Sequence, residues 1–408
     1  MRLFDKIKEV REKGGIRRIV FHTIPYNLYK VFDPVIGLIV KSICLKKPMQ
    51  DIIIIESHND FDNNGGAFYD YLIENGFNKK YKLVWFLRNK APRNLPENVH
   101  CVRYARLSIK RWYYHCLAKY IVCGHFMIES IRKEQLSIYT THASLSLKNP
   151  KGYIHIPKNV NYYLCPSENV ASIIADAFMM DYPNEKQLIL GFPDLDVLHN
   201  SVPGDLFRIT DREYKKKILW MPTFRKTNDG RSDSDYSYDL GIPLIKTEEE
   251  FCKLNQFLKK LECLLIIKLH PMQNLSSVKV KSMSNVIILS GDDVKKLGVD
   301  NYRLMKDADA LISDYSAAAS DYLQLDRPLA YSVDDLKEYK LGFIVEDPRE
   351  LMAGHLLYDL EDLFAFVNDV IYDHDKYKAK RKTVREYIFK YNDGDNCKRL
   401  AQFLGIEK

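Results

Sequence analysis

The chain has 408 residues, of which 46% are hydrophobic and 28% are charged. This composition excludes a disordered polar chain and a collagen-like protein, and the length predicts two domains rather than one. The eight cysteines show no repeated short spacing and the amino terminus lacks the usual secretory pattern, so we expect a protein of the reducing cytosol.

The positive charge is concentrated at the amino terminus. Residues 1–48 contain 11 Lys and Arg but 4 Asp and Glu, which accounts for the whole formal charge of +7. Apolar residues recur there at spacings of three and four, as in an amphipathic helix, but no apolar run approaches the ~20 residues of a spanning helix. We expect this segment to lie on an anionic membrane surface; the alternative is a helix that packs on the protein with a solvated basic face. Nucleic acid is not the expected partner, because no nucleic-acid motif accompanies the charge. The apolar residues are Ile16, Val20, Ile24, Leu28, Val31 and Phe32.

From residue 49 onward, short apolar runs alternate with helical patterns. This alternation predicts an α/β fold with parallel sheets and helices on both faces, in two Rossmann-like halves. Pro203 and Gly204 interrupt the pattern where the halves join. The predicted domains are 1–48, 49–205, 206–375 and 376–408. The predicted strands are 52–55, 83–86, 120–123, 137–141, 162–165, 217–221, 264–269, 286–289, 310–312 and 329–331.

In the first half, a polar stretch after the strand at 52–55 contains Asn64, Gly65 and Gly66. Glycines let a ligand approach the backbone at a helix start, so we predict that these three residues bind a phosphate. The alternative is an ordinary Asn-Gly turn.

No metal site is predicted. Two histidines and two cysteines lie in one part of the first half, but their spacing fits no standard zinc pattern. No dedicated carboxylate cluster is evident, so a divalent cation stays possible without a named site. The four residues are His115, Cys116, Cys123 and His125.

In the second half, three apolar runs end in polar residues. The first ends at Thr223 and Arg225, and the second ends at Lys268 and His270, which point to one face of a continuing strand. The third stops at Ser313 and leads into a helix that starts near Ser316. Ligands of open α/β sheets bind beyond the carboxyl ends of the strands, so this edge is expected to hold a phosphate or diphosphate.

These segments, read in order, carry a family resemblance. They are Met-Pro-Thr-Phe-Arg at 221–225, Lys-Leu-His-Pro at 268–271, and Ser-Asp-Tyr-Ser at 313–316 followed by Asp321, Arg327 and Pro328. Together they resemble the CDP-glycerol glycerophosphotransferase family, whose enzymes build teichoic acid and related polyol-phosphate polymers. The resemblance extends over roughly residues 50–355.

The resemblance implies a GT-B fold, with two Rossmann-like domains that face a cleft and terminal helices that cross back to the first domain. It also implies transfer of glycerol phosphate from CDP-glycerol to a hydroxyl of a lipid-linked or polymeric acceptor, with release of CMP, by a peripheral enzyme at the cytoplasmic face of the membrane. A rival hypothesis is a CDP-ribitol or other CDP-polyol donor. More distant hypotheses are a nucleotide-sugar glycosyltransferase and a non-catalytic protein that binds anionic polymer or membrane.

If CDP-glycerol is the donor, the residues at the three strand ends are expected to bind it or to stabilise the charge that develops during transfer. Ser316, with the N–H groups of Ala317 and Ala318, is expected to contact the diphosphate; the alternative is that Ser316 only caps the helix. Arg225 and His270 are the candidates that stabilise the negative charge on departing CMP. For His270 the alternative is a hydrogen-bonded histidine before a turn proline. The other predicted donor-binding residues are Thr223, Lys268, Ser313 and Asp321, the last of these through the ribose hydroxyls.

The acceptor hydroxyl needs a general base, and His142 is the candidate. The run that ends at His142 resembles the strand that delivers a histidine to the cleft in this family; the alternative is a surface histidine. The family usually continues with Gly-Thr-Pro-Leu-Lys, whereas residues 143–148 are one residue longer and lack the glycine and the proline. Lys148 is predicted to bind the acceptor, and the phosphate predicted at Asn64, Gly65 and Gly66 is expected to belong to the acceptor. Asp194 stands where the family often has arginine, so a phosphate contact is expected to be missing or supplied elsewhere. The polar loop 226–243 is expected to act as a lid.

Overall fold

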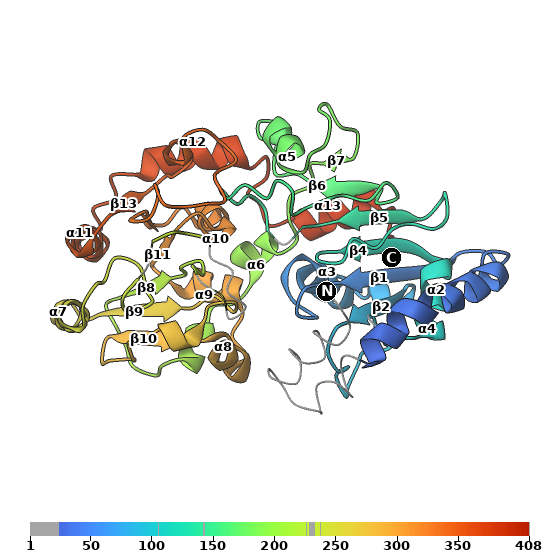
Figure 1. Ribbon diagram of the computed structural model, residues 1–408, viewed down its shortest axis with the longest axis horizontal. Helices are drawn as coiled ribbons and strands as arrows, with labels where there is room; N and C mark the ends of the chain where they lie inside the picture. Colours follow the sequence, from blue (N-terminus) through green and yellow to red (C-terminus); the bar gives the residue numbers. More distant parts are fainter. Residues whose placement is uncertain are drawn as a thin grey trace, which may run out of the picture. The chain divides into compact units, whose positions relative to one another are not determined.

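The computed structural model describes residues 24–104, 106–141, 143–225, 227, 233–236 and 238–407. It contains two sheets and divides into two compact units. The first unit comprises residues 1–142, 156–163 and 400–408, and the second comprises residues 143–155 and 164–399. In Figure 1 the strands of the first sheet run from blue to green and those of the second from yellow to orange.

The first sheet has the strand order β3-β2-β1-β4-β5-β6-β7, and its pairs from β3 to β6 are parallel. Residues 52–55 of β1 are isoleucines with at most 1% exposure, as expected for a central strand covered on both faces. The strand order reverses between β1 and β4, so this pair is the topological switch point. The strands are β1 (Gln50–Glu56), β2 (Lys82–Leu87), β3 (Val99–Arg103), β4 (Ala118–Cys123), β5 (Leu136–Tyr139), β6 (Tyr162–Leu164) and β7 (Gln187–Leu188).

In the part of the first unit that the structure describes, the helices α2, α3 and α4 precede or connect these strands. The helix α4 contacts both α2 and β1, and α3 contacts β1. The last residues of the chain also belong to this unit, where the ring of Phe403 packs 5.3 Å from that of Tyr162. The bounds are α2 (Ile24–Cys44), α3 (Asn63–Glu74), α4 (Ile109–Leu117) and, partly in this unit, α13 (Asn396–Phe403).

The second sheet has the order β10-β9-β8-β11-β12-β13, with every adjacent pair parallel. Its switch point is the pair β8 and β11. Apolar side chains of β8, β9 and β11 form one core with α7 and α11. Thr247 caps α7 by accepting a hydrogen bond from the N–H of Glu250, which fixes where that helix begins. The strands are β8 (Lys216–Trp220), β9 (Cys263–Lys268), β10 (Val286–Leu289), β11 (Ala310–Ser313), β12 (Leu329–Ser332) and β13 (His355–Leu357).

The helices of the second unit are α5 (Ala171–Ala177), α6 (Leu195–Asn200), α7 (Glu248–Lys260), α8 (Gly291–Leu297), α9 (Asn301–Asp307), α10 (Ala317–Tyr322), α11 (Leu360–Ile371) and α12 (Lys378–Ile388). The predicted α/β class with two parallel sheets is confirmed. Each of the ten predicted strands is present within a few residues, whereas β3, β7 and β13 were not predicted. All three are short and lie at or next to a sheet edge, where apolar periodicity is weakest.

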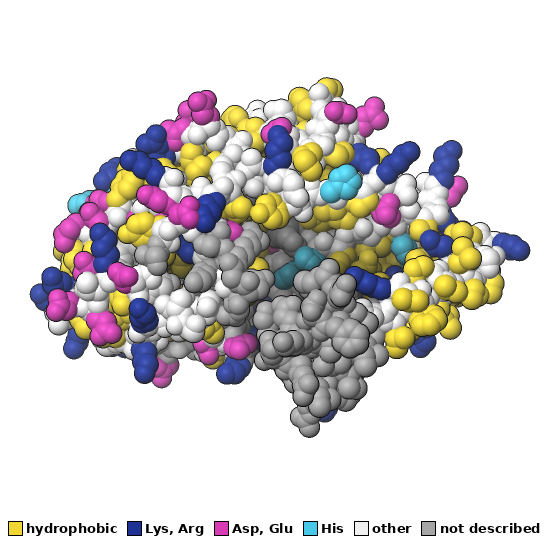
Figure 2. Space-filling view, viewed as in Figure 1, with side chains coloured by type: hydrophobic (Ala, Val, Ile, Leu, Met, Phe, Trp, Pro, Cys, Tyr) yellow, Lys and Arg dark blue, Asp and Glu magenta, His cyan; other side chains and the backbone are white. Residues whose placement is uncertain are grey.

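The helix α2 is amphipathic, with one side packed on α4. Asp33 forms a buried ion pair with Arg111, and a Cβ at Gly37 would stand 2.6 Å from the ring of Trp112. The other side is apolar and exposed, and Figure 2 shows its hydrophobic side chains gathered over the helix. Among the residues described, no helix combines the length and hydrophobicity needed to span a bilayer. The exposed apolar residues are Leu28, Val31, Phe32, Val35, Leu38, Ile39 and Ile43.

Candidate functional site

Asp314 organises the switch point of the second sheet. It follows β11 directly and is fully buried. Its carboxylate accepts hydrogen bonds from the N–H and the hydroxyl of Thr223 at 2.8 and 2.5 Å and from the N–H of Ser316 at 3.1 Å. Arg225 Nη1 lies 2.8 Å from the same carboxylate. Asp314 therefore joins the polar end of β8 to the start of α10.

Arg225 is buried between two carboxylates. Besides Asp314, it pairs through Nε with Asp335 at 2.6 Å, and the hydroxyl of Tyr315 donates to Asp335 at 2.9 Å. Burial alone would lower the pKa of Arg225, but the two aspartates hold it well above its ordinary value. Burial pushes the pKa of Asp314 upward, yet Arg225 and then Lys148 hold it below its usual range. The sequence predicted a guanidinium turned toward the donor, and the structure instead shows one that ties three segments together.

Lys148 lies at this site. The segment that carries it is held on the second unit, because Leu147 N–H donates to the carbonyl of Tyr315 at 3.2 Å and Asn149 N–H donates to that of Gly342 at 3.1 Å. The ammonium of Lys148 donates to the hydroxyl of Thr223 at 3.4 Å. Lys148, predicted as an acceptor ligand, is thus grouped with the predicted donor residues.

The end of β9 adds Lys268 and His270. Lys268 is 6% exposed, and the described part of the chain offers its ammonium neither a hydrogen bond nor an ion pair. Burial lowers its pKa to about 8, although Asp300 acts in the opposite direction. The N–H of Met272 donates to His270 Nδ1 at 3.1 Å, and the ring lies 5.0 Å from that of Phe224. Because Nδ1 accepts, the neutral ring carries its proton on Nε2, where it is a donor.

A charge count separates these cations. Arg225 with Asp314 and Asp335 carries a net charge of −1, which does not attract a diphosphate. Lys148 and Lys268 supply positive charge at the same edge, and Lys268 is not already paired with a described carboxylate. These two lysines therefore suit an anionic ligand better than Arg225 does.

The remaining predicted donor residues have internal partners. The hydroxyl of Ser313 donates to the carbonyl of Met221 at 3.1 Å. Ser316 is the N-cap of α10 and accepts a hydrogen bond from the N–H of Ala318 at 3.4 Å, while Ala317 is buried in the first turn. The cap that was the structural alternative for Ser316 is thus present.

Asp321 is a buried carboxyl rather than an exposed one on the helix surface. The hydroxyl of Ser144 donates to it, and the Tyr302 hydroxyl lies 3.0 Å from Asp321 and 3.0 Å from Asp194. A hydroxyl has a single proton, so both contacts are satisfied when one of the two carboxyls is itself protonated. Burial raises the pKa of both groups, and for Asp194 the charge of Asp321 adds to the effect. The prediction that Asp321 contacts a ribose is at odds with this burial, since its oxygens have protein partners.

In the first unit, the space predicted for a ligand is filled by the chain itself. A Cβ at Gly65 would stand 3.0 Å from the carbonyl oxygen of Glu56, and one at Gly66 would stand 2.7 Å from the backbone of Phe61. The glycines permit this close packing at the start of α3; acceptor binding by Asn64, Gly65 and Gly66 stays a prediction.

Asn64 is fully buried, and its Nδ2 donates to the carbonyls of Thr140 and Thr141 at 3.1 and 3.4 Å. Thr141 has a φ of 59°, in the left-handed region that threonine rarely adopts. Asn64 therefore braces the turn that leads directly to His142. His142 itself lies outside the described residues, as does most of the predicted lid.

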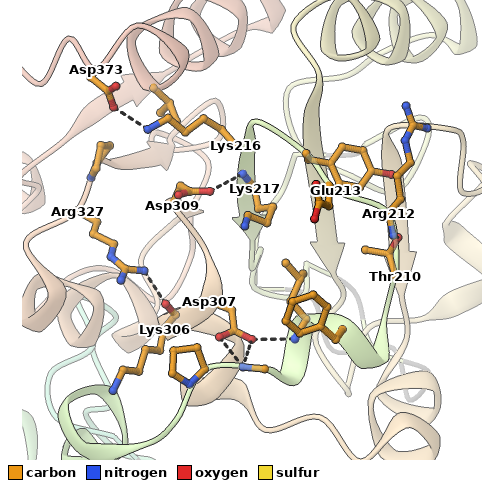
Figure 3. A pocket seen from close by; sticks show the side chains of 17 residues that line it. Thr210, Arg212, Glu213, Lys216, Lys217, Lys306, Asp307, Asp309, Arg327 and Asp373 are labelled. Carbon is orange, nitrogen blue, oxygen red and sulfur yellow. Dashed lines mark hydrogen bonds and ion pairs between the residues drawn. The ribbon is translucent and has the colours of Figure 1, made fainter.

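A cavity of about 650 Å³ opens at the opposite edge of the second sheet (Figure 3). It lies where β8, β11 and β12 begin and contains none of the predicted site residues. Its charged groups largely have structural partners: Lys216 pairs with Asp373 at 2.7 Å, and Lys306 donates to the carbonyls of His199 and Ser201. We assign this cavity no part in donor binding.

Sequence reasoning missed Asp314 and Asp335 as organising residues. Asp314 stands within the recognised Ser-Asp-Tyr-Ser segment, Asp335 follows the strand after it, and the signal was available. A buried arginine requires carboxylate partners, and these are the aspartates that follow β11 and β12. Among the described residues, no group of three or more His, Cys, Asp or Glu side chains is placed to hold a metal ion.

Comparison with known proteins gives a consistent result. The family model described as CDP-Glycerol:Poly(glycerophosphate) glycerophosphotransferase matches residues 39–405. The teichoic acid poly(glycerol phosphate) polymerase of Bacillus spizizenii (strain ATCC 23059 / NRRL B-14472 / W23) is 24% identical over 94% of this chain and 98% of its own length. The teichoic acid glycerol-phosphate primase of Bacillus subtilis (strain 168) is 28% identical over 70% of this chain and 72% of its own. The teichoic acid ribitol-phosphate primase of the same Bacillus spizizenii strain is 25% identical over 67% of this chain and 70% of its own.

A solved structure of the wall teichoic acid polymerase TagF superposes with a TM-score of 0.71 over 99% of this chain and 98% of that chain, at 18% identity. That likeness shows the GT-B-like fold. Because the family model covers most of the sequence, the chain belongs to the CDP-glycerol:poly(glycerophosphate) glycerophosphotransferase family, the enzymes that transfer glycerol phosphate from CDP-glycerol in teichoic acid synthesis.

Proposed function

We propose that this enzyme holds CDP-glycerol at the carboxyl edge of the second sheet, where β8, β9 and β11 end, and passes its glycerol phosphate to a hydroxyl of a lipid-linked or polymeric acceptor. The observation that carries the proposal is the presence at this edge of two lysines, Lys148 and Lys268, beside a closed Asp–Arg–Asp network. The network fixes the loops, and the lysines supply the charge.

In the proposed reaction the acceptor hydroxyl attacks the phosphorus that bears glycerol. The bond between that phosphorus and the bridging oxygen breaks, and CMP leaves with the electron pair. His142 takes the hydroxyl proton. Lys148, Lys268 and the Nε2–H of His270 stabilise the charge that develops on CMP, which is the electrostatic assistance expected for phosphoryl transfer. Arg225 is a positioning residue here, because it acts through Asp314 and Asp335.

The decisive experiment is a donor panel. Purified enzyme is incubated with CDP-glycerol, CDP-ribitol or a UDP-sugar and a teichoic acid primer, and the released nucleotide is identified. We expect CMP from CDP-glycerol, and CMP release that drops at least about a hundredfold in His142→Ala and in His270→Ala. Release of UDP from the sugar nucleotide, or full activity in both variants, would defeat the proposal.

CDP-ribitol is the second candidate donor, because one relative is a ribitol-phosphate primase. Faster CMP release from CDP-ribitol than from CDP-glycerol would assign that donor and leave the rest of the proposed chemistry unchanged.

We also propose that the enzyme sits on the inner face of the membrane through α2 and the basic segment before it. The support is the exposed apolar side of α2 next to the concentrated positive charge of residues 1–48. Apolar burial and attraction to anionic lipid add to each other in such a segment.

A further inference from the structure

Three nitrogen-bearing side chains meet at the carboxyl edge of the first sheet. His58 follows β1, Arg88 follows β2 and His125 follows β4. Arg88 Nη1 lies 3.1 Å from His58 Nδ1, and His125 Nδ1 lies 3.1 Å from the same atom. β1 and β4 form the switch point, so His58 and His125 flank the crevice in which open α/β sheets bind ligands.

The group is fixed by packing as well as by hydrogen bonds. The two imidazole rings stand edge to face with centroids 4.5 Å apart, and the Arg88 guanidinium lies 5.3 Å from the centre of the Phe126 ring. Arg88 also donates to the carbonyl of His58 at 3.1 Å. A set of side chains held in place in this way loses little freedom when a ligand binds.

Arg88 supplies the positive charge of the group, because burial and then Arg88 itself lower the pKa of His58. The nearby carboxylates are turned toward backbone N–H groups: Asp60 accepts from Arg88 and Asn89 at 2.8 and 2.7 Å, and Asp62 accepts from Asn59 at 3.1 Å. Burial raises the pKa of the Glu56 carboxyl beneath them to about 7, so much of its negative charge is absent near neutral pH.

Two further arginines extend the positive charge along the sheet edge. Arg103 ends β3 and Arg106 lies just beyond it, close enough for each charge to be felt by the other. The edge thus offers imidazoles after β4 and β1, and guanidinium groups after β2 and at the end of β3, to an extended anion. A poly(glycerol phosphate) chain is such an anion, with one charge on each repeating phosphodiester.

We propose that His58, Arg88 and His125 bind the phosphate nearest the growing end of the acceptor, with Arg103 and Arg106 following the chain away from it. β4 pairs with β5, and the chain after β5 continues to His142. Adjacent strands lie about 4.8 Å apart, so a phosphate held at the end of β4 is within roughly one glycerol phosphate unit of the neighbouring strand end. This inference rests on the proposed function and assigns its acceptor subsite.

The test compares two soluble acceptors, a short glycerol phosphate oligomer and an uncharged oligoglycerol that offers the same terminal hydroxyl. The variants are His58→Gln with Arg88→Gln, and His125→Gln; His100→Gln, which changes a histidine elsewhere on β3, is the matched control. We expect the KM for the phosphate oligomer to rise about tenfold or more in the site variants. The KM for the uncharged acceptor and the Kd for CDP-glycerol should stay at wild-type values, and the control should match wild type. A site that does not recognise phosphate would show equal KM changes for both acceptors, or none.

Direct binding separates this inference from the reaction itself. Isothermal titration of the glycerol phosphate oligomer without donor should give a Kd that weakens with added salt and is lost in the site variants. If the oligomer binds wild type and the variants equally, the subsite is wrong even when turnover is normal. If CDP-glycerol yields no CMP while the oligomer still needs His58 and Arg88 to bind, the anion site stands and the proposed reaction fails.

Discussion

Lys268 carries a buried positive charge that does not stabilise the folded protein. A buried ammonium without a described carboxylate partner costs stability, and its depressed pKa records that cost. Such a charge is explained if a bound anion forms an ion pair with it, and the diphosphate of the donor is an anion of this kind. Stability and donor affinity should therefore respond in opposite directions when this residue is replaced.

We predict that Lys268→Met weakens CDP-glycerol binding at pH 7 by about tenfold or more while the folded protein stays at least as stable. In wild type the lysine loses its proton as pH rises through about 8, so donor affinity should fall above that pH. In the unfolded chain, Lys268 keeps its proton up to its higher ordinary pKa. The buried charge therefore lowers the free energy of unfolding by its full amount below pH 8, and by less as the pH rises above 8. Titrations of CDP-glycerol at pH 7 and pH 9 with wild type and variant check both signs; a wild-type affinity that does not change with pH would contradict the assignment.

Asn64 illustrates a positioning effect at the same scale. Asn64→Ala leaves two carbonyls of the turn before His142 without their donor and relaxes the left-handed Thr141. We predict that kcat falls about ten- to a hundredfold, because small displacements of a catalytic group are costly, while the Kd for CDP-glycerol is unchanged. Asn78→Ala, which removes a similar side chain hydrogen bond to the carbonyl of Glu97, is the control. Equal kcat values for Asn64→Ala and wild type would mean that the brace is unrelated to catalysis.

Residue identity was easier to predict from sequence than residue role. The polar residues after the apolar runs marked the edge that we propose for the donor, because strand ends are visible in the pattern. The partners of Arg225 were not visible, since Asp314 and Asp335 approach it from distant parts of the chain. The packing of Gly65 against the backbone of Glu56 could not be predicted either. The sequence does not show whether a glycine makes room for a ligand or for another part of the backbone.

Among the elements, α2 carries the prediction that is most open to test. Leu38 and Ile39 expose 73% and 55% of their surface on the side of the helix away from α4. Burying two such side chains in the interface of a bilayer contributes roughly 1.5–3 kcal/mol each at full burial. Leu38→Ser with Ile39→Ser should therefore lower binding to vesicles that contain anionic lipid by at least about tenfold, without loss of CMP release on a soluble acceptor.

Val202→Ser, at an apolar position of the second unit that is 82% exposed, is the control for that experiment. Sedimentation with vesicles measures the bound fraction. If the α2 variant and the control sediment alike, the apolar side has another purpose; if activity on the soluble acceptor is also lost, the helix serves the fold rather than the membrane.

The strands show which elements a sequence reveals. Runs such as Ile52–Ile55 and Leu264–Leu269 are long, apolar and central, and they were predicted within a residue or two. The missed strand β3 carries His100 and Arg103, and β13 begins with His355, so neither has the continuous apolar pattern. These strands form because a neighbouring strand supplies backbone hydrogen bonds. This pairing depends on tertiary contacts, which the local sequence pattern does not reveal.

At the scale of the whole molecule, each sheet offers a polar edge at its own switch point. The first presents imidazoles and arginines, and the second presents lysines beside a closed ionic network. If the two edges serve different substrates, each substrate should protect a different unit from hydrogen exchange. We predict that CDP-glycerol protects peptides spanning 221–227, 263–273 and 313–322, and that a glycerol phosphate oligomer protects peptides spanning 56–66, 86–90 and 121–127.

Mass spectrometry after exchange, with each ligand alone, reads both units in one experiment. Protection of the same peptides by both ligands would contradict separate subsites.

The family, the fold and the transfer reaction were within reach of the sequence, because ordered motifs at strand ends identify all three. The proposed distribution of substrates over the two units rests on side chains brought together from separate strands, such as His58 and His125, and only a three-dimensional structure displays them.

The hydroxyl of Tyr302, placed between Asp194 and Asp321, has a consequence for how the protein exchanges acid with its solvent. The unfolded chain ionises both aspartates at neutral pH, whereas the folded core retains a hydrogen ion between α6, α9 and α10. Folding must then draw that ion from the buffer, so the heat measured for unfolding should depend on the ionisation enthalpy of whichever buffer receives it.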